Sequence, residues 1–534
     1  MKPNYTYLIL CMVLLFVSAP AVAKTKAFAL VVGNNTAPQE SSLDTLKFAD
    51  DDAVRFYRFF LKFADTAVLM TVPDEKTQAR YHGISSIAMI PDLARFQQTF
   101  RKITQKMQKA RNSGFETVLY ITYSGHGAYD ESGNAYLTLV SGRVTHQMLF
   151  DAIKKANADY THLFIDACYA GDMVHSRGPF SKETSGRRVT VPDEMMDSLT
   201  DETRTSLPGL GVLIAASENG MTHEWSAIES GVFTHELLSG LSGPADINLD
   251  GRIEYSEIVA FVSVANRNVE DIRGKIRIIG EPPGRNQNAP IVDLATLSNV
   301  AYLVGNPSHL GHFHVELDGG ERYLDANLGD MMWMHVVLPA NRTAYLYVHD
   351  KFVAMTPHDD EVIRLKNLEY SGNAFLPKGQ LDRALMEGLF SSEYGRRYYT
   401  GFIDSAQLTG VRFDTPEFHM PSAGPFDLFG KRRNQRKTAA IVSLSIASVA
   451  AATAIVLGAL TINAKKDFDN TDYHKPSVDA DERYYRYSGA FWGVTGVMVL
   501  GTAVGIALMP KKKRVNSHGL SIGESNALSL TCRF

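Results

Sequence analysis

Apolar runs of strand length alternate with stretches of helical periodicity over residues 24–290. The runs predict buried strands at 27–32, 66–72, 117–123, 161–165 and 211–215. Apolar positions at helical spacing predict helices at 43–63, 93–110, 146–156 and 233–241. Strands separated by helices favour an α/β domain in which a mainly parallel sheet is flanked by helices.

The pattern changes after about residue 295, where apolar and polar residues alternate. This alternation predicts short antiparallel strands and a β-rich accessory module over 295–420, for which we expect a binding role. His312 and His314 would share one strand face, with His309 and Glu316 nearby. Polar side chains on a solvated sheet face explain this spacing better than a metal site does.

Both ends of the chain carry apolar segments that suggest membrane targeting. Residues 1–23 hold an apolar run and the small residues Ala21-Val22-Ala23, which is the layout of a secretory signal peptide, with an uncleaved anchor as the alternative. Residues 438–462 and 488–509 are uncharged and long enough to span a bilayer. They predict a transmembrane helical hairpin before a tail at 510–534, and a buried soluble hairpin is the alternative.

The flanking charges and the signal peptide predict opposite orientations for this hairpin. Lysines and arginines at 431–437 and 511–514 flank both spans, and by the positive-inside rule these flanks would be cytoplasmic. The signal peptide would place them outside. Because large domains are translocated largely regardless of charge, we expect an exported, membrane-anchored protein whose α/β domain is periplasmic or otherwise extracytoplasmic.

Composition and charge exclude some classes of function. The 534 residues are 45% hydrophobic and 21% charged, as in ordinary globular proteins, and the net charge of -4 gives no field that would attract nucleic acid.

Of the three cysteines, Cys11 lies in the signal peptide, so only Cys168 and Cys532 remain. Two cysteines are too few for a disulfide framework, and Cys168 therefore needs another explanation. The oligomeric state stays open.

Two of the predicted strands end in residues that can perform nucleophilic catalysis. One strand leads into Ser124-Gly125-His126-Gly127, and another leads into Asp166-Ala167-Cys168. If these strands are neighbours, an imidazole and a thiol project from the same sheet edge, as a cysteine nucleophile and its base require. The N–H groups of Gly127 and Cys168 could then stabilise an oxyanion. Taken singly, a cysteine after an apolar strand is usually a small core residue.

These residues match a known family. YSGHG at 123–127 and DACYAG at 166–171 resemble the His and Cys motifs of caspase-like peptidases, in particular metacaspases and their bacterial relatives, the orthocaspases. The resemblance covers roughly residues 26–290. It implies a caspase-hemoglobinase fold and peptide hydrolysis through an acyl-enzyme on Cys168, with His126 as general base and acid.

Specificity follows partly from strand geometry. Asp166 and Cys168 alternate on one strand, so both point to the same face, and a carboxylate there favours arginine or lysine at the cleaved position of a protein or peptide substrate. In the caspases, a tryptophan followed by an arginine grips substrate aspartate, whereas here Trp225 is followed by Ser226. We therefore expect Asp166, Trp225 and Ser226 to contact substrate; the alternative for Asp166 is that it only orients local backbone.

A long polar segment separates the strands at 161–165 and 211–215. In caspase relatives this region is a linker that is often cut during activation. The resemblance therefore predicts self-cleavage within 170–210, after one of the basic residues Arg177, Lys182, Arg187, Arg188 and Arg204.

A second motif occupies residues 246–257. Its oxygen donors have the spacing of an EF-hand loop, and Gly251 is at the position of the sharp bend. We expect a calcium ion there, structural or activating, and a tight Asn/Asp/Gly turn is the alternative. The ligands would be Asp246, Asn248, Asp250, Arg252 through its carbonyl, Glu254 and Glu257.

Two hypotheses of different class remain. The first is a cysteine endopeptidase that cuts after Arg or Lys. The second is a catalytically inactive caspase-like scaffold or calcium-binding interaction protein, anchored in the membrane. The presence of both His126 and Cys168 favours the enzyme.

Overall fold

The fold is that of a computed structural model of the chain. The structure describes residues 24–36, 44–131, 134–167, 206–217, 224–270, 275–331, 333–371, 387–408, Phe413 and a few isolated residues between 454 and 502. The chain divides into two compact units, 1–428 and 429–534. Nearly all described residues, and every helix and strand named below, belong to the first unit.

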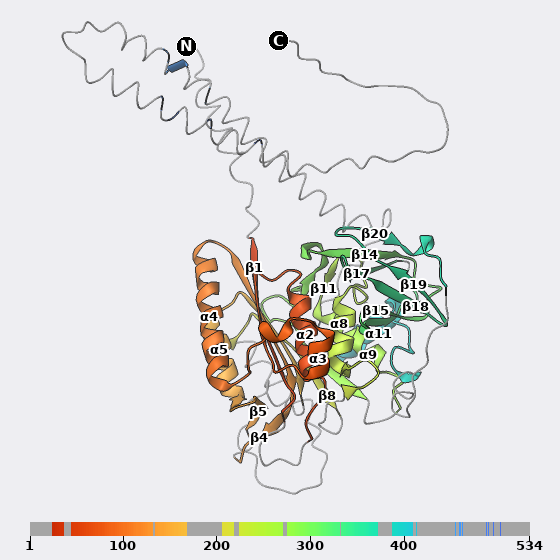
Figure 1. Cartoon of the computed structure of the whole chain (residues 1–534), viewed down its shortest axis with the longest axis horizontal. Coiled ribbons are helices and arrows are strands. Elements are labelled where there is room, and N and C mark those ends of the chain that lie inside the picture. Colours follow the sequence, from red (N-terminus) through yellow and green to blue (C-terminus); the bar gives the residue numbers. More distant parts are fainter. Residues whose placement is uncertain are drawn as a thin grey trace, which may run out of the picture. The chain divides into compact units, whose positions relative to one another are not determined.

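A six-stranded sheet forms the centre of the first unit (Figure 1). Its strand order is β12-β8-β7-β3-β1-β2. Five strands are parallel, and β12 runs antiparallel to β8 at one edge. The strands are β1 (Thr25–Asn34), β2 (Thr66–Met70), β3 (Glu116–Gly125), β7 (Tyr160–Ala167), β8 (Leu210–Ser217) and β12 (Ile276–Glu281). The mainly parallel sheet is thus confirmed, and the antiparallel edge makes it mixed.

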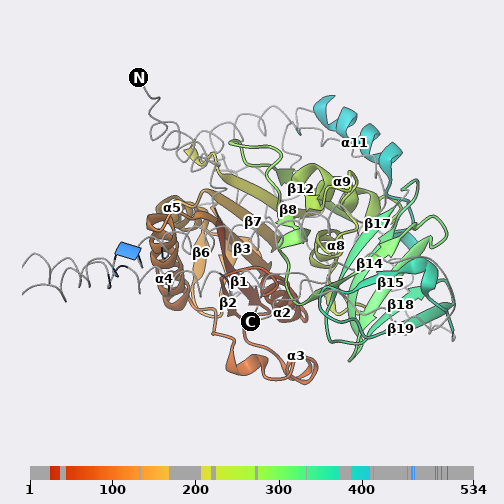
Figure 2. The same cartoon turned by 90° about the horizontal axis from the view of Figure 1, so that it is seen from above.

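Helices cover both faces of the sheet (Figure 2). One face packs against α4 (Leu93–Asn112) and α5 (His146–Ala156), and the other against α2 (Ala49–Phe60), α8 (Val232–Leu241) and α9 (Tyr255–Ala265). Alternation along the strands divides the core accordingly. Leu119 and Leu163 join the α4 cluster, whereas the Tyr120 ring lies 5.0 Å from that of Phe60 on α2.

Short elements lie around the sheet, and most of them are at the carboxyl ends of its strands. They are α3 (Glu75–Arg80), β4 (Gly127–Tyr129), β5 (Ala135–Thr138), β6 (Arg143–Thr145), β9 (Glu224–Trp225), β10 (Ser230–Gly231), β11 (Arg252–Ile253) and β13 (Val292–Asp293). Strands β4, β5 and β6 form a small sheet next to β3, and β9 pairs with β10 directly before α8. These additions place two small hairpins beside the strand tips.

The β-rich module contains two sheets, of order β17-β14-β20 and β16-β15-β18-β19. Its strands are β14 (Val300–Gly305), β15 (His312–Leu317), β16 (Glu321–Asn327), β17 (Met334–Pro339), β18 (Ala344–Val348), β19 (Lys351–Met355) and β20 (Val362–Arg364). Strand β16 packs on α8, and the helix α11 (Arg396–Leu408) packs on α9. The module and the α/β domain therefore form one unit.

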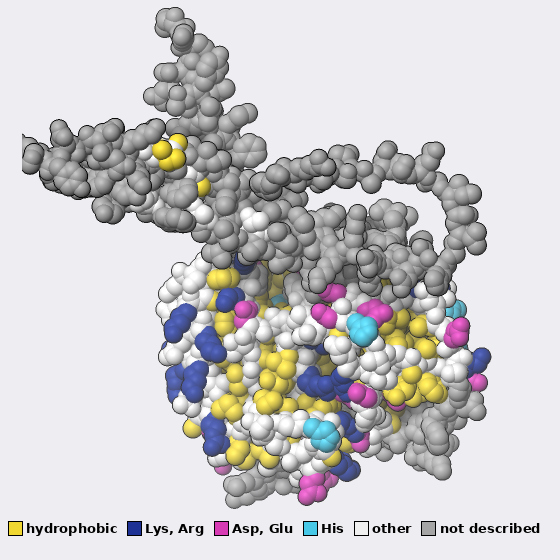
Figure 3. Space-filling model, turned by 45° about the horizontal axis from the view of Figure 1, so that its top comes forward, with side chains coloured by type: hydrophobic (Ala, Val, Ile, Leu, Met, Phe, Trp, Pro, Cys, Tyr) yellow, Lys and Arg dark blue, Asp and Glu magenta, His cyan; other side chains and the backbone are white. Residues whose placement is uncertain are grey.

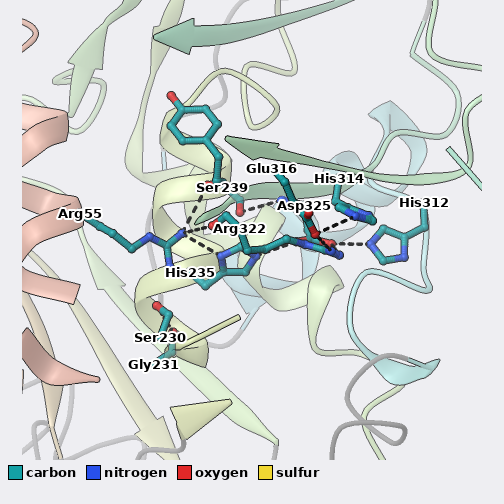
Figure 4. A network of polar contacts seen from close by, with 11 residues as sticks. Arg55, Ser230, Gly231, His235, Ser239, His312, His314, Glu316, Arg322 and Asp325 are labelled. Carbon is teal, nitrogen blue, oxygen red and sulfur yellow. Dashed lines mark hydrogen bonds and ion pairs between the residues drawn. The ribbon is translucent and has the colours of Figure 1, made fainter. Parts of the chain in front are cut away.

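The predicted alternation along β15 is confirmed, and its polar face is half-buried, with the side chains of His312, His314 and Glu316 31%, 20% and 30% exposed. His312 Nε2 lies 2.8 Å from an oxygen of Asp325, and the side chain of Asp325 is only 2% exposed (Figure 4). The other Asp325 oxygen lies 2.8 Å from His235 Nε2 on α8. Arg322 also donates to both Asp325 oxygens. The polar face is half-buried because this network links it to the α/β domain.

The predicted targeting segments lie almost entirely outside the described residues. Within the part of the chain that the structure describes, no helix has the length and apolar character needed to cross a membrane. The signal peptide and the hairpin therefore stay predictions.

The surface in Figure 3 carries Lys and Arg side chains beside acidic and apolar ones, in keeping with the small net charge.

Candidate active site

The two strands with reactive tips are neighbours. Strands β3 and β7 pair in parallel, with Ser124 opposite Asp166 and Gly125 opposite Ala167. The next residue after Gly125 is His126, and the next after Ala167 is Cys168. The predicted adjacency of the strands is therefore confirmed, although Cys168 itself lies outside the described residues.

Gly125 shapes the turn that leads into His126. Its φ is +156°, and a Cβ at this position would lie 2.6 Å from Tyr123 Oη and 2.9 Å from Asn34 O. A side chain there would clash with backbone as well as with the tyrosine, so the turn requires glycine. Tyr123 Oη in turn donates to His126 O over 2.8 Å. The backbone of His126 is thus held rigidly at the end of β3.

The ring of His126 is buried, and only one of its two nitrogens has a hydrogen-bond partner among the described residues. The residue is 5% exposed, and Nε2 lies 2.9 Å from the backbone oxygen of Asp44. Because a carbonyl can only accept, Nε2 carries the proton and Nδ1 of the neutral ring is left with its lone pair. No described residue is a hydrogen-bond partner of Nδ1. Burial lowers the pKa of His126, which favours the neutral ring that a general base requires.

Gly127 begins β4 and is buried directly after His126. Strand β4 pairs with β5, where Gly127 lies opposite Leu137. The other predicted oxyanion donor, the N–H of Cys168, lies outside the described residues. The oxyanion pair therefore stays a prediction.

Asp166 points to the face of the sheet that α8 covers. Its Oδ2 accepts hydrogen bonds from Thr234 N at 3.2 Å and Thr234 Oγ1 at 2.8 Å, in the first turn of α8. Burial raises the pKa of Asp166 to about 7, and the charge of Asp52 contributes to that rise. A second carboxylate therefore lies close to the predicted substrate-binding residue.

Asp52, on α2, was not identified from the sequence. Its oxygens accept from Ser124 Oγ at 2.8 Å, from Ser230 Oγ at 2.6 Å and from Gly231 N at 3.1 Å. Burial raises the pKa of Asp52 too, against hydrogen bonds that lower it. Because Asp50, Asp51 and Asp52 are consecutive, they look like ordinary acids in the first turn of a helix, and only the fold distinguishes Asp52 from its neighbours.

Gly231 lies next to both carboxylates. A Cβ on Gly231 would be 2.6 Å from Asp166 Oδ2 and 2.9 Å from Asp52 Oδ2. Because Gly231 has no side chain, both carboxylates can pack closely against it. Each of these two buried carboxylates disfavours ionisation of the other, so a cation that reached them would stabilise both.

Trp225 and Ser226 belong to the hairpin that carries Gly231. Trp225 pairs with Ser230 across β9 and β10, and Trp225 is 3% exposed, whereas Ser226 is exposed. The carboxylate of Glu224 accepts from the N–H groups of Lys47 and Phe48, which ties the hairpin to the start of α2. The hairpin positions Gly231 beside the two carboxylates. The indole of Trp225 is buried and offers little surface to a substrate.

The predicted calcium loop connects α8 to α9. Asp246 Oδ2 accepts from Gly251 N at 3.0 Å, and Asn248 Oδ1 accepts from Asp250 N at 2.9 Å. Asp250 Oδ1 accepts from Arg252 N at 2.7 Å, and Gly251 has a φ of +80°. The loop therefore turns sharply at its sixth position, as the motif predicts.

The side chains of this loop offer the carboxylate and amide oxygens that calcium prefers. Asp246 Oδ1 and Glu254 Oε2 are buried and have no hydrogen-bond partner among the described residues. The carboxylate of Glu257 accepts from the backbone N–H groups of Ile247 and Glu254. Within the described residues, no three carboxylate, imidazole or thiolate side chains are grouped as metal ligands. The donor types and the orphaned oxygens suit the ion, while Glu257 is engaged with backbone.

The family to which the chain is similar defines a class of protein, the hydrolases of the cysteine-peptidase type. Residues 26–295 match the family model of the caspase domain, and the chain belongs to the caspase family. The caspase domain gives the chain its general assignment as a cysteine-type peptidase acting on protein substrates.

Comparison with solved structures finds a crystal structure of caspase-1 from Spodoptera frugiperda and a structure of pro-sf-caspase-1. The first has 10% identity and a TM-score of 0.28, covering 48% of this chain and 85% of that chain. The second has 12% identity and a TM-score of 0.28, covering 48% and 87%. No curated protein matches the chain.

Proposed function

We propose that the protein is a cysteine endopeptidase of the metacaspase type with a Cys168–His126 dyad. The pairing of β3 with β7 carries this proposal, because it places the residue before His126 opposite the residue before Cys168. The unpartnered Nδ1 of His126 supplies a base at that edge.

The reaction follows from these groups. Nδ1 of His126 accepts the thiol proton, and the Cys168 thiolate attacks the carbonyl carbon of the scissile bond. The oxyanion is stabilised by the N–H groups of Gly127 and Cys168. His126 then protonates the leaving amine, and water hydrolyses the thioester with His126 again as base. Asp44 O keeps the ring in the tautomer that this sequence of steps needs.

The cleaved bond follows a basic residue. Asp166 and Asp52 form a buried pair of carboxylates on the same strand face on which alternation places residue 168. An arginine side chain can pair bidentately with a carboxylate and relieve their repulsion. A substrate aspartate would meet only like charge. We expect Arg to be preferred over Lys, and both over Asp.

Cleavage of fluorogenic peptides with Arg, Lys or Asp before the scissile bond tests the proposal. We expect hydrolysis of the arginyl and lysyl peptides only. A folded protein that cleaves none of them, with or without calcium, would favour the inactive scaffold instead.

We expect self-cleavage within 170–210, after one or more of Arg177, Lys182, Arg187, Arg188 and Arg204. The segment offers basic residues to the specificity just described, and residues 168–205 lie outside the described residues. The measurement is mass spectrometry of fragments from the wild type and from Cys168→Ala. The wild type should yield fragments that the variant lacks, and identical fragment patterns would reject the idea.

We further propose that the loop at 246–257 binds one Ca²⁺. Its oxygen donors and the two buried, unpartnered carboxylate oxygens support this. The ligands would be Asp246, Asn248, Asp250, Arg252 O, Glu254 and Glu257, and the bound ion would offset the repulsion among their carboxylates. We expect it to brace the connection between α8 and α9. Export and membrane anchoring, supported by the sequence alone, complete the proposal.

Removal of calcium should lower the melting temperature of the wild type. With calcium at about 100 times its Kd, binding contributes about 2.7 kcal/mol, so chelation should shift Tm by several degrees. The variant Glu257→Gln, which removes a ligand charge, should lose this response, measured by differential scanning fluorimetry with calcium or with chelator. Asp151→Gln, on the exposed side of α5, is the control and should respond like the wild type. Equal Tm values of the wild type in both buffers would contradict calcium binding.

A further inference from the structure

A pocket lies between α2, α8 and the β-rich module, and neither the peptidase chemistry nor the calcium loop uses it. Its volume is about 240 Å³. This is below the range of about 300–1,000 Å³ in which proteins usually hold drug-sized ligands, so only a small molecule would fit. Its lining includes the last turn of α2, Leu238 on α8, and the start of β16.

The lining carries more positive than negative charge. It contains four cationic side chains, Arg55, Arg58, Lys62 and Arg342, and a single carboxylate, Glu321. One oxygen of Glu321 accepts from Arg58 at 3.0 Å and from Arg342 at 2.9 Å. Glu321 therefore accepts from two of the cations, whereas Arg55 and Lys62 donate to no carboxylate among the described residues.

Arg55 is the most constrained of these cations. It is 6% exposed, and its Nη2 bonds His235 Nδ1 at 2.9 Å and Arg322 O at 3.0 Å (Figure 4). Its Nη1 is buried and has no hydrogen-bond partner among the described residues. A buried guanidinium that keeps an N–H unpaired is costly unless an anion accepts from it.

Lys62 stands at the same pocket with an equally incomplete set of partners. Its Nζ donates to Tyr323 Oη at 2.8 Å and makes no ion pair within the described part of the chain. It lies over the rings of Phe59 and Tyr323, 5.5 Å and 5.0 Å from their centroids. Aromatic and aliphatic walls thus adjoin the cationic groups, with Leu238 and Leu317 completing the apolar part.

We propose that this pocket binds a small organic anion, a carboxylate or phosphate attached to an apolar or aromatic group. The anionic group would accept from Arg55 and Lys62, and the apolar part would lie between Phe59 and Tyr323. Charge-assisted hydrogen bonds to the cations would supply most of the affinity. The proposal does not depend on peptidase activity.

Isothermal titration of the full chain at constant ionic strength tests it. The probes are phenyl phosphate and benzoate, with phenol as the neutral analogue. We expect saturable binding of at least one anion at one site per chain and none of phenol. Binding of phenyl phosphate alone would identify phosphate as the recognised group, and binding of benzoate alone would identify carboxylate.

Three variants separate binding in the pocket from general charge effects. Lys62→Gln should weaken binding about ten-fold by removing one charge-assisted hydrogen bond, whereas Lys102→Gln, exposed on α4, should bind like the wild type. Ala340→Phe keeps every charge but fills the pocket and should abolish binding. The proposal is overturned if neither anion saturates, or if Lys62→Gln and Ala340→Phe bind as the wild type does. Circular dichroism confirms that each variant is folded.

Discussion

Replacing Cys168 by Ala, or His126 by Ala, is expected to lower kcat/KM for an arginyl peptide by about 10⁴-fold or more. Without the thiol no acyl-enzyme can form, and without the imidazole no neighbouring group takes the thiol proton. Because the two groups act as a unit, the double variant should be no worse than the single ones. Steady-state kinetics of the purified variants measures all three effects.

The chain offers matched controls for both substitutions. Cys532→Ala removes the other cysteine of the mature protein, and His82→Gln removes an exposed histidine. Both variants should cleave at the rate of the wild type. Substantial activity in a folded Cys168→Ala variant would refute the dyad, and an inactive Cys532→Ala variant would show that the wrong thiol had been chosen.

Local signals in the sequence determine much of the α/β domain. The helix predicted at 146–156 from apolar spacing has the bounds of α5, where Thr145 accepts from Met148 N as the cap and Asn157 ends the helix in the left-handed conformation. The strands before His126 and Cys168 are predicted because they are continuous apolar runs, which is how buried parallel strands are built.

Features that depend on tertiary contact could not be predicted in the same way. Asp52 becomes part of the site only because α2 packs on the sheet face to which Asp166 points and lies beside Gly231. Strand β12 is short and joins the sheet antiparallel at its edge, where periodicity alone gives no direction. The partial burial of His312 depends on Asp325 of the next strand, which is in turn held by His235 of α8, a helix distant in the sequence.

Replacing Asp166 by Asn is expected to have opposite effects on activity and on stability. Loss of the carboxylate should lower kcat/KM for an arginyl peptide by about 100-fold, since removing one partner of a buried charge pair costs about 2–5 kcal/mol. Thr234 can still donate to the amide oxygen, so the local hydrogen bonds survive. The control Asp151→Asn, exposed on α5, should change neither property.

The stability effect follows from the pKa of Asp166. Burial raises it from 3.8 to about 7, so the folded state disfavours ionisation. The favourable contribution of the protonated acid is complete below about pH 4 and is lost as the pH rises to about 7. Asn mimics the protonated form. The variant should therefore match the wild type near pH 4 and exceed it at pH 8 by up to about 4 kcal/mol, measured by denaturant unfolding.

The same pKa makes the activity of the wild type dependent on pH. An arginyl side chain needs an ionised carboxylate, so kcat/KM for the arginyl peptide should fall as the pH falls below about 7. The lowered pKa of His126 alone would put this loss below pH 6.5. If Asp166 only orients backbone, the Asn variant would be stabilised yet keep the preference of the wild type for arginyl over uncharged peptides. A stabilised variant that has lost this preference would assign the carboxylate to substrate recognition, because a purely structural acid has no means of distinguishing the two peptides.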